Sequence, residues 1–168
     1  SWNQQYEQCK NLLIENITVD SKNYWNNDGI DIVDCDSVMV RNNYIDASDD
    51  AICLKSHQAD FLCQNVKIIN NVIRSSASGI KFGTFSIGGF KNIAIINNTV
   101  FDTYRSAITF AAVDGGIVEN IMVDSLRSLN TGNVIFLRIG ARKPGRIGSM
   151  KNIRISNSLR TESCFIEL

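Results

Sequence analysis

The sequence predicts an all-β protein built as a parallel β-solenoid of about six coils. Six short segments align along the chain at a period of about 27 residues, and each is followed, after a turn, by a second short segment of alternating apolar residues. β-Branched residues and Asn/Gly/Ser turns recur at matching places, whereas no comparable helical period is visible and the one proline, Pro144, lies in a loop. Single strands repeated at a fixed period are typical of a solenoid whose coils stack on one another.

The first segment of each repeat starts with an apolar residue and carries a polar residue two positions later. The starting residues are Cys9, Cys35, Cys63, Phe90, Val118 and Met150. Because three cysteines share this register with large apolar residues, we expect them to be buried hydrophobes rather than reactive thiols.

Asparagine recurs in two further columns of the repeat. The first contains Asn11, Ser37, Asn65, Asn92, Asn120 and Asn152, and the second contains Asn16, Asn42, Asn70, Asn97, Ser125 and Asn157. We expect side-chain amide ladders between coils. The sequence leaves open which member points inward in the pairs Asn42-Asn43, Asn70-Asn71 and Asn97-Asn98.

The second segments begin at Gly29, Ala51, Gly79, Ala107, Val134 and Cys164. Their alternation predicts strands with one apolar face, to which Ile30, Ile52 and Ile80 belong. The last of these segments, residues 164–168, ends the sequence inside a coil. Residues 1–168 are therefore expected to form one β-helix domain that continues into further coils of the same protein at both ends.

Composition excludes several classes of partner. The chain has 17 basic and 17 acidic residues and no formal net charge, so no long-range field favours nucleic acid or an anionic membrane. No apolar run is long enough for a transmembrane helix, and the first residues lack the features of a signal peptide. We therefore expect neither nucleic acid nor a membrane as a partner.

Two acidic turns precede the first two of these second segments. Stacking places Asp28 and Asp50 in one column, followed by Ser78, Ser106 and Asn133. Adjacent coils lie about 4.8 Å apart, so we expect Asp28 within several ångströms of Asp49 and Asp50. Like charges at this range raise the pKa of at least one carboxyl. Such a group suits acid/base catalysis by a glycosidase, but a solvated acidic turn or a calcium site fits the pattern equally well.

Two rows of outward side chains are expected to extend this surface along the second strands. One row contains Asp31, Cys53, Lys81, Thr109 and Phe136, and the next contains Lys55, Gly83, Ala111 and Arg138. The expected surface therefore mixes acids with cations.

The acidic turns resemble two motifs of the family 28 glycoside hydrolases, which include polygalacturonases and rhamnogalacturonan hydrolases. Residues 26–31 are similar to Asn-Thr-Asp-Gly-(Ile/Phe)-Asp with one change, and residues 49–56 match Asp-Asp-x-Ile-x-(Ile/Leu)-Lys-Ser throughout. The resemblance implies a right-handed, single-stranded parallel β-helix of the pectin lyase-like type. It also implies secretion or a periplasmic location, since pectin is extracellular.

The resemblance further implies inverting hydrolysis without a cofactor or a metal ion. The family's general acid falls on Asp49, and the pair that activates water falls on Asp28 and Asp50. Inverting enzymes separate their carboxyl groups by roughly 6.5–9.5 Å, which suits groups on neighbouring coils. Asp31 and Lys55 are expected to support the site or contact the substrate.

Two motifs of the polygalacturonases are missing. Gly-His-Gly should fall on residues 77–79, where Ser78 replaces the histidine, and Arg-Ile-Lys should fall on residues 109–111. The only histidine, His57, follows the second motif. We hypothesise that Lys81, Arg105 and Arg138, with Ser78 beside them, rebuild a cationic subsite for a uronate carboxylate. The alternative is that each cation is an ordinary solvated side chain.

Two loops are candidates for the walls of a cleft. Residues 141–146 form a basic turn in the longest coil, directly after the segment that carries Arg138. Tyr24 and Trp25 precede the first acidic motif and could stack on a sugar ring or pack over a neighbouring coil.

The predicted function is hydrolysis of a glycosidic bond in a pectic polysaccharide or oligosaccharide, either a galacturonide or rhamnogalacturonan. A calcium-dependent polysaccharide lyase is a second possibility, because lyases also use parallel β-helices. A non-catalytic, glycan-binding β-helix is a third. Fold alone does not decide among them.

Overall fold

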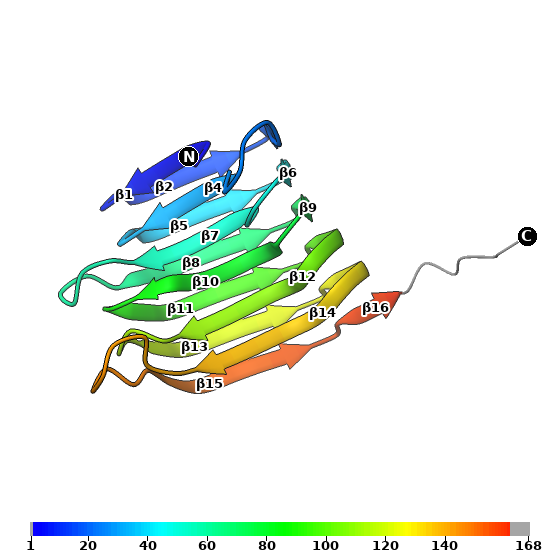
Figure 1. The fold of residues 1–168 in the computed structure, drawn as a ribbon. Helices are drawn as coiled ribbons and strands as arrows, with labels where there is room; N and C mark the ends of the chain where they lie inside the picture. The colour runs from blue at the N-terminus through cyan, green and yellow to red at the C-terminus, as the bar shows by residue number, and fades with distance from the viewer. Residues whose placement is uncertain (1, 162–168) are drawn as a thin grey trace, which may run out of the picture.

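The computed structural model describes residues 2–161 as a right-handed parallel β-helix of about six coils (Figure 1). The coils stack from the N-terminal strand β1 (Gln4–Glu7) to β16 (Leu159–Thr161), and every paired strand is parallel to its neighbour. Among these residues there is no helix of the length and hydrophobicity needed to cross a bilayer. The predicted fold class is confirmed.

One face of the solenoid is a six-stranded sheet formed by the first segments of the repeats. Its strands follow the order of the coils: β2 (Lys10–Glu15), β5 (Asp36–Arg41), β8 (Cys63–Ile69), β11 (Gly89–Ile96), β13 (Ile117–Asp124) and β15 (Ser149–Ser156). Phe90 is paired with Cys63 and Val118, as the alignment of the repeats predicted.

The second segments lie in a ten-stranded sheet, in which they form β4 (Ile30–Val33), β7 (Ile52–Ser56), β10 (Ser78–Ser86) and the later parts of β12 (Thr99–Ala112) and β14 (Arg127–Ile139). Ile30, Ile52, Ile80, Ile108 and Ile135 are paired in sequence from coil to coil. This register confirms the predicted column of Asp28, Asp50, Ser78, Ser106 and Asn133. The last predicted segment, residues 164–168, lies outside the described residues.

A third strand in each coil was missed by the sequence analysis. It forms β3 (Thr18–Ser21), β6 (Tyr44–Ala47), β9 (Val72–Ser75) and β16, and it runs without a break into the second segment in β12 and β14. The sequence did contain a signal for this strand, because an apolar residue stands three positions after the second asparagine column in the first four coils. Val19, Ile45, Ile73 and Val100 occupy these places and are buried.

The core fills the interior with one layer of side chains per coil. Phe82 is fully buried between Phe90 and Phe110, with ring centroids 5.4 and 4.6 Å away. Cys35 and Cys63 are buried and Cys9 is half-buried, and all three are free thiols. They pack with the core as apolar groups, as predicted.

Asparagine makes the turns between the sheets. The members of both predicted columns adopt left-handed backbone angles, with φ between 49° and 62°, a region that asparagine tolerates better than most residues. Asn92, Asn120 and Asn152 each donate a side-chain hydrogen bond of 3.1 Å to the preceding coil. The predicted ladders are therefore present, and the outer ones are exposed.

The open question about the asparagine pairs is settled by a buried inner ladder. Asn43 donates to Asn71, and Asn71 donates to Asn98, through side-chain amides at 3.0 and 2.9 Å. The second member of each pair therefore points inward. The first member makes the left-handed turn.

Candidate active site

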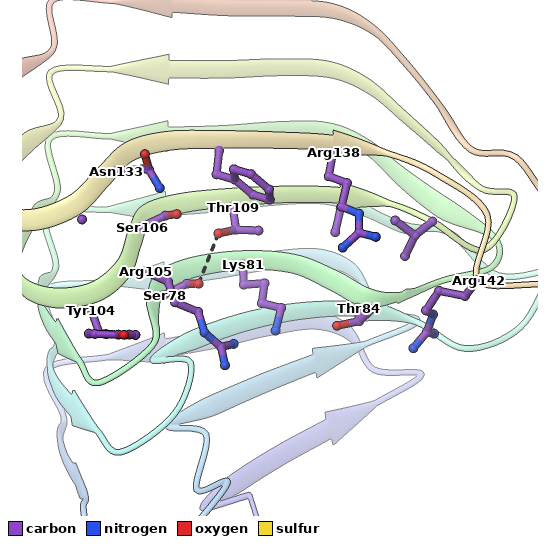
Figure 2. A pocket seen from close by; sticks show the side chains of 14 residues that line it. Ser78, Lys81, Thr84, Tyr104, Arg105, Ser106, Thr109, Asn133, Arg138 and Arg142 are labelled. Carbon is purple, nitrogen blue, oxygen red and sulfur yellow. Dashed lines mark hydrogen bonds between the residues drawn. The ribbon is translucent and has the colours of Figure 1, made fainter.

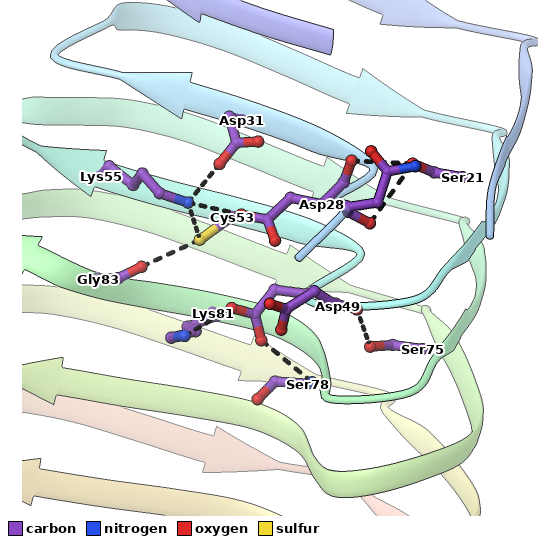
Figure 3. A network of polar contacts seen from close by, with 12 residues as sticks. Ser21, Asp28, Asp31, Asp49, Cys53, Lys55, Ser75, Ser78, Lys81 and Gly83 are labelled. Atoms are coloured by element: carbon purple, nitrogen blue, oxygen red, sulfur yellow. Dashed lines mark hydrogen bonds and ion pairs between the residues drawn. The ribbon is translucent and has the colours of Figure 1, made fainter. Parts of the chain in front are cut away.

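Asp28, Asp49 and Asp50 meet where the coils enter the strands β4 and β7, and Figure 3 labels the first two of them. Asp28 lies two residues before β4, and Asp49 and Asp50 lie just before β7. One carboxylate oxygen of each residue lies within 4.8 Å of the others, as the repeat predicted. Asp28 and Asp50 are buried, whereas Asp49 is half-buried.

Asp50 is held by groups on the next coil. The Ser78 backbone N–H donates to Asp50 Oδ1 at 3.1 Å, and the Lys81 ammonium donates to Oδ2 at 2.5 Å. Both groups belong to β10, whose register with β7 brings them over the turn. The carboxylate therefore has a defined position and a cationic partner.

Asp28 belongs to a second ion pair, which is more deeply buried. The Lys55 ammonium donates to Asp28 Oδ2 at 2.8 Å and also to Asp31, and the Cys53 sulfur lies 2.9 Å from it. The Trp2 ring covers this ammonium, with its centroid 4.3 Å from Nζ, a cation–π contact.

This arrangement corrects one expectation. The two outward rows were predicted to extend the surface, but Asp31 and Cys53 are fully buried, and Lys55, Thr109 and Ala111 are nearly so. Both rows are outward with respect to the core, but Asp31 and Cys53 contact the Lys55 ammonium, and the Trp2 ring lies over that ammonium. Lys81, further along the same sheet, lies partly open to solvent.

Two carboxylates share the single charge of Lys55. Burial raises the pKa of Asp31 to about 7, with the charge of Asp28 adding to this effect and that of Lys55 opposing it. Burial works against the charged form of Lys55, but the surrounding acidic groups raise its pKa overall. Asp28 Oδ1 and Asp31 Oδ2 are buried and accept no hydrogen bond within residues 2–161.

Asp49 differs from its two neighbours. Its backbone is fixed, because its N–H donates to the Asn27 carbonyl and its own carbonyl accepts the Ser75 hydroxyl. Burial raises the pKa of its carboxyl, and the charges of Asp50 and Asp28 raise it further against those of Lys81 and Arg105. A carboxyl with a raised pKa can deliver a proton at a pH where ordinary aspartates are ionised.

The three carboxylates lie close together. One oxygen of each lies within 4.8 Å of one oxygen of the others, because Asp28 and Asp50 occupy one column on adjacent coils and Asp49 directly precedes Asp50. A water about 2.8 Å from each of two such oxygens spans this distance. The cluster can therefore hold one water between two carboxylates.

The same cluster is a poor site for a divalent cation. Calcium requires six to eight oxygen ligands. Two of the three carboxylates here already bind lysine ammoniums. A second cluster of Asp28, Asp31 and Cys53 surrounds Lys55 itself, so a cation there would meet an existing positive charge.

A cavity of about 550 Å³ lies on the C-terminal side of the acids (Figure 2). It contains the predicted Lys81, Arg105 and Arg138, which come from three successive coils. Its remaining walls include Tyr104 and Phe136, both well exposed. Within residues 2–161, the guanidinium groups of Arg105 and Arg138 have no hydrogen-bond or ion-pair partner, whereas the Lys81 ammonium is bound to Asp50.

The predicted loops also line cavities. In the basic turn, Arg142 reaches the first cavity and forms two hydrogen bonds to Asp114, at 2.7 and 2.5 Å. Tyr24 and Trp25 are exposed, and they line a second cavity of about 550 Å³ that also contains Asp49 and Arg105. The two cavities thus share Arg105, and the half-buried Asp49 lines the second.

The missing motifs leave small polar groups at their positions. Ser78 is buried, and its hydroxyl bonds the Thr109 hydroxyl at 3.1 Å. His57 does not replace the absent histidine, because its ring packs against Phe85 at the other end of β7. Among the residues that sequence reasoning missed, Trp2 stands out. By the register of β1 with β4 it lies one coil before Asp28 in the same column.

Comparison with known proteins agrees with this geometry. The model of glycosyl hydrolases family 28 matches residues 3–107, a stretch that includes all three aspartates and well over half of the chain. No curated protein matches the chain. The match and the β-helix together show that the chain belongs to glycosyl hydrolases family 28.

Proposed function

We propose that this protein hydrolyses a glycosidic bond in a pectic polysaccharide or oligosaccharide, a galacturonide or rhamnogalacturonan, with inversion at the anomeric carbon. The observation that carries the proposal is the contrast within the acidic cluster. The Asp49 carboxyl is half-exposed and has a raised pKa, while the adjacent Asp28 and Asp50 carboxylates are each bound to a lysine. Inverting hydrolysis requires a carboxylic acid that donates a proton and a carboxylate that activates water, and the cluster offers both.

In this mechanism Asp49 donates its proton to the glycosidic oxygen as the bond from that oxygen to the anomeric carbon breaks. A water held between Asp28 and Asp50 attacks the anomeric carbon from the opposite face and gives a proton to one of the two carboxylates. The leaving sugar departs as an alcohol, and the new hydroxyl has the inverted configuration. Transfer of the remaining proton through solvent restores Asp49.

The two cavities that share Arg105 support an acidic substrate. Arg105 and Arg138 present guanidinium groups without partners among residues 2–161, and a guanidinium binds a carboxylate through two parallel hydrogen bonds. The exposed rings of Trp25, Tyr104 and Phe136 offer flat apolar faces to the sugar rings. These groups favour a uronic acid on at least one side of the scissile bond.

The test is hydrolysis of polygalacturonic acid, rhamnogalacturonan and their oligomers by wild-type protein and by Asp49→Asn. Loss of the general acid should lower the rate by roughly 10²–10⁴. Asp60→Asn, which changes an exposed carboxylate outside the cluster, is the matched control and should retain full activity.

Two other results would redirect the proposal. Unsaturated products that disappear with a chelator would indicate a calcium-dependent lyase instead. Retained binding without turnover of any substrate would indicate a glycan-binding β-helix.

A further inference from the structure

Lys81 makes a contact that sets it apart from the two arginines beside it. Its ammonium lies 2.5 Å from Asp50 Oδ2, and the side chains of Lys81 and Asp50 are only 15% and 4% exposed. The other Asp50 oxygen accepts the Ser78 N–H at 3.1 Å. Both oxygens of this carboxylate are thus held by β10, and one of the two contacts depends on the Lys81 side chain (Figure 3).

Direct binding of a substrate carboxylate would compete with this contact. If the Lys81 ammonium turned toward a ligand, the buried Asp50 carboxylate would lose its cationic partner, which is costly at low exposure. Arg105 and Arg138 carry no such cost, because neither is paired within the described part of the chain. Recognition of an acidic sugar therefore falls to the arginines.

We propose that Lys81 is a positioning residue, which fixes the Asp50 carboxylate beside Asp28 and Asp49 for activation of water and does not itself bind the substrate. This inference rests on the proposed function and assigns Lys81 a role different from that of the cationic subsite.

The charges around the pair indicate what its loss would do. The groups that act on Lys81 and on the neighbouring Asp49 are Asp28, Asp50, Cys53, Lys55 and Arg105. Lys81 is one of two cations that lower the pKa of Asp49 against the effects of burial and of its neighbours. Removing its charge should therefore move the titration of Asp49 to higher pH.

The first test is an NMR titration of the aspartate carboxyl carbons in wild-type protein, Lys81→Gln and Lys81→Arg. In Lys81→Gln the Asp49 signal should titrate at higher pH, and Lys81→Arg should restore most of the shift. Lys67→Gln, on the exposed outer face of the six-stranded sheet, is the matched control and should leave the Asp49 signal unchanged. Unchanged titration of Asp49 in Lys81→Gln would overturn the proposal.

Kinetics supply the second readout. The bell-shaped pH profile of kcat/KM should shift toward higher pH in Lys81→Gln, with kcat falling more than KM rises. A rise in KM for uronate substrates with an unshifted profile would show that Lys81 binds substrate instead.

The results can also distinguish failure of the proposed hydrolase function from failure of the proposed role of Lys81. If wild-type protein hydrolyses none of the substrates, the proposed function fails, whereas the titration still decides whether Lys81 holds Asp50. If Lys81→Gln does not fold, the reciprocal variant Asp50→Asn replaces it, and the Lys81 ammonium should then titrate at lower pH than in wild-type protein. No change in the titration of Lys81 would show that Lys81 and Asp50 do not form an ion pair.

Discussion

The protein has two similar lysine–aspartate ion pairs between adjacent coils, and the two pairs differ in what covers them. In each pair a lysine from the next coil binds an aspartate of the acidic cluster. Lys55 binds Asp28 in a pocket closed by Trp2, whereas Lys81 binds Asp50 at the edge of a cavity. The closed pair is part of the support for the site, while the open pair lies where substrate can approach.

The column that carries the acids explains the difference. In order along the solenoid it contains Trp2, Asp28, Asp50, Ser78, Ser106 and Asn133. A large ring closes the N-terminal side, whereas small polar side chains leave the C-terminal side hollow. Ser78, Ser106 and Asn133 accordingly line the cavity that contains Arg105 and Arg138 (Figure 2).

The largest expected effect comes from breaking the closed pair. Lys55→Met should lower the free energy of unfolding by about 3–5 kcal/mol, because it leaves Asp28 and Asp31 buried without a cation. Lys81→Met should cost less, since Asp50 keeps the Ser78 N–H and Lys81 is the more exposed of the two lysines, at 15% against 6%. The loss in free energy of unfolding is measured by chemical denaturation of both variants, with the exposed Lys67→Met as control. Equal losses at the two lysines would contradict the contrast between a closed and an open pair.

A second effect is expected in the pH dependence of stability. The pKa of Asp31 is about 7 in the folded protein, and an aspartate in an unfolded chain titrates near 3.9. The folded state therefore binds more protons between these values, so Asp31 makes stability fall as the pH rises from about 4 to 7. The slope is at most about 1.4 kcal/mol per pH unit.

Asp31→Asn should remove this contribution, because the amide does not titrate. Its stability relative to wild-type protein should accordingly increase from pH 4 to pH 7 in denaturation curves measured at each pH. Parallel curves for the two proteins would mean that Asp31 is ionised throughout this range.

The smallest effect on stability is expected in the open region. Arg105→Ala and Arg138→Ala should leave the melting temperature nearly unchanged, because neither side chain has a partner within residues 2–161. Each should raise KM for uronate substrates about tenfold, as expected when a charge-assisted hydrogen bond is lost. Arg154→Ala, on the outer face of the other sheet, controls for the change in net charge. An unaltered KM in both cavity variants would remove the proposed subsite.

The period of the repeat made the stacking of the coils and the positions of several site residues predictable. The recurrence of Ile30, Ile52 and Ile80 predicted the stacking, and stacking alone brought Asp28 within reach of Asp49 and Asp50. The same register correctly placed Lys81, Arg105 and Arg138 around one surface. These predictions succeeded because adjacent coils repeat one backbone path, so that sequence offset translates directly into position.

Other features depend on side-chain conformations that a register does not determine. The row containing Asp31 was correctly aligned, but a register does not show that Asp31 and Cys53 both contact the Lys55 ammonium or that the Trp2 ring lies over it. The choice of Lys81 between Asp50 and solvent is likewise a matter of rotamer and charge. The third strand of each coil was missed because its short apolar pattern follows the asparagine turn without a separating signal.

The most direct test of the account is the anomeric configuration of the first product, followed by proton NMR in the minutes after wild-type protein is added to an oligogalacturonide or a rhamnogalacturonan oligomer. The account predicts a saturated product with the inverted configuration, and loss of this signal in Asp49→Asn. A product with retained configuration would contradict it, since the cluster would then act through a covalent intermediate rather than through a water between Asp28 and Asp50.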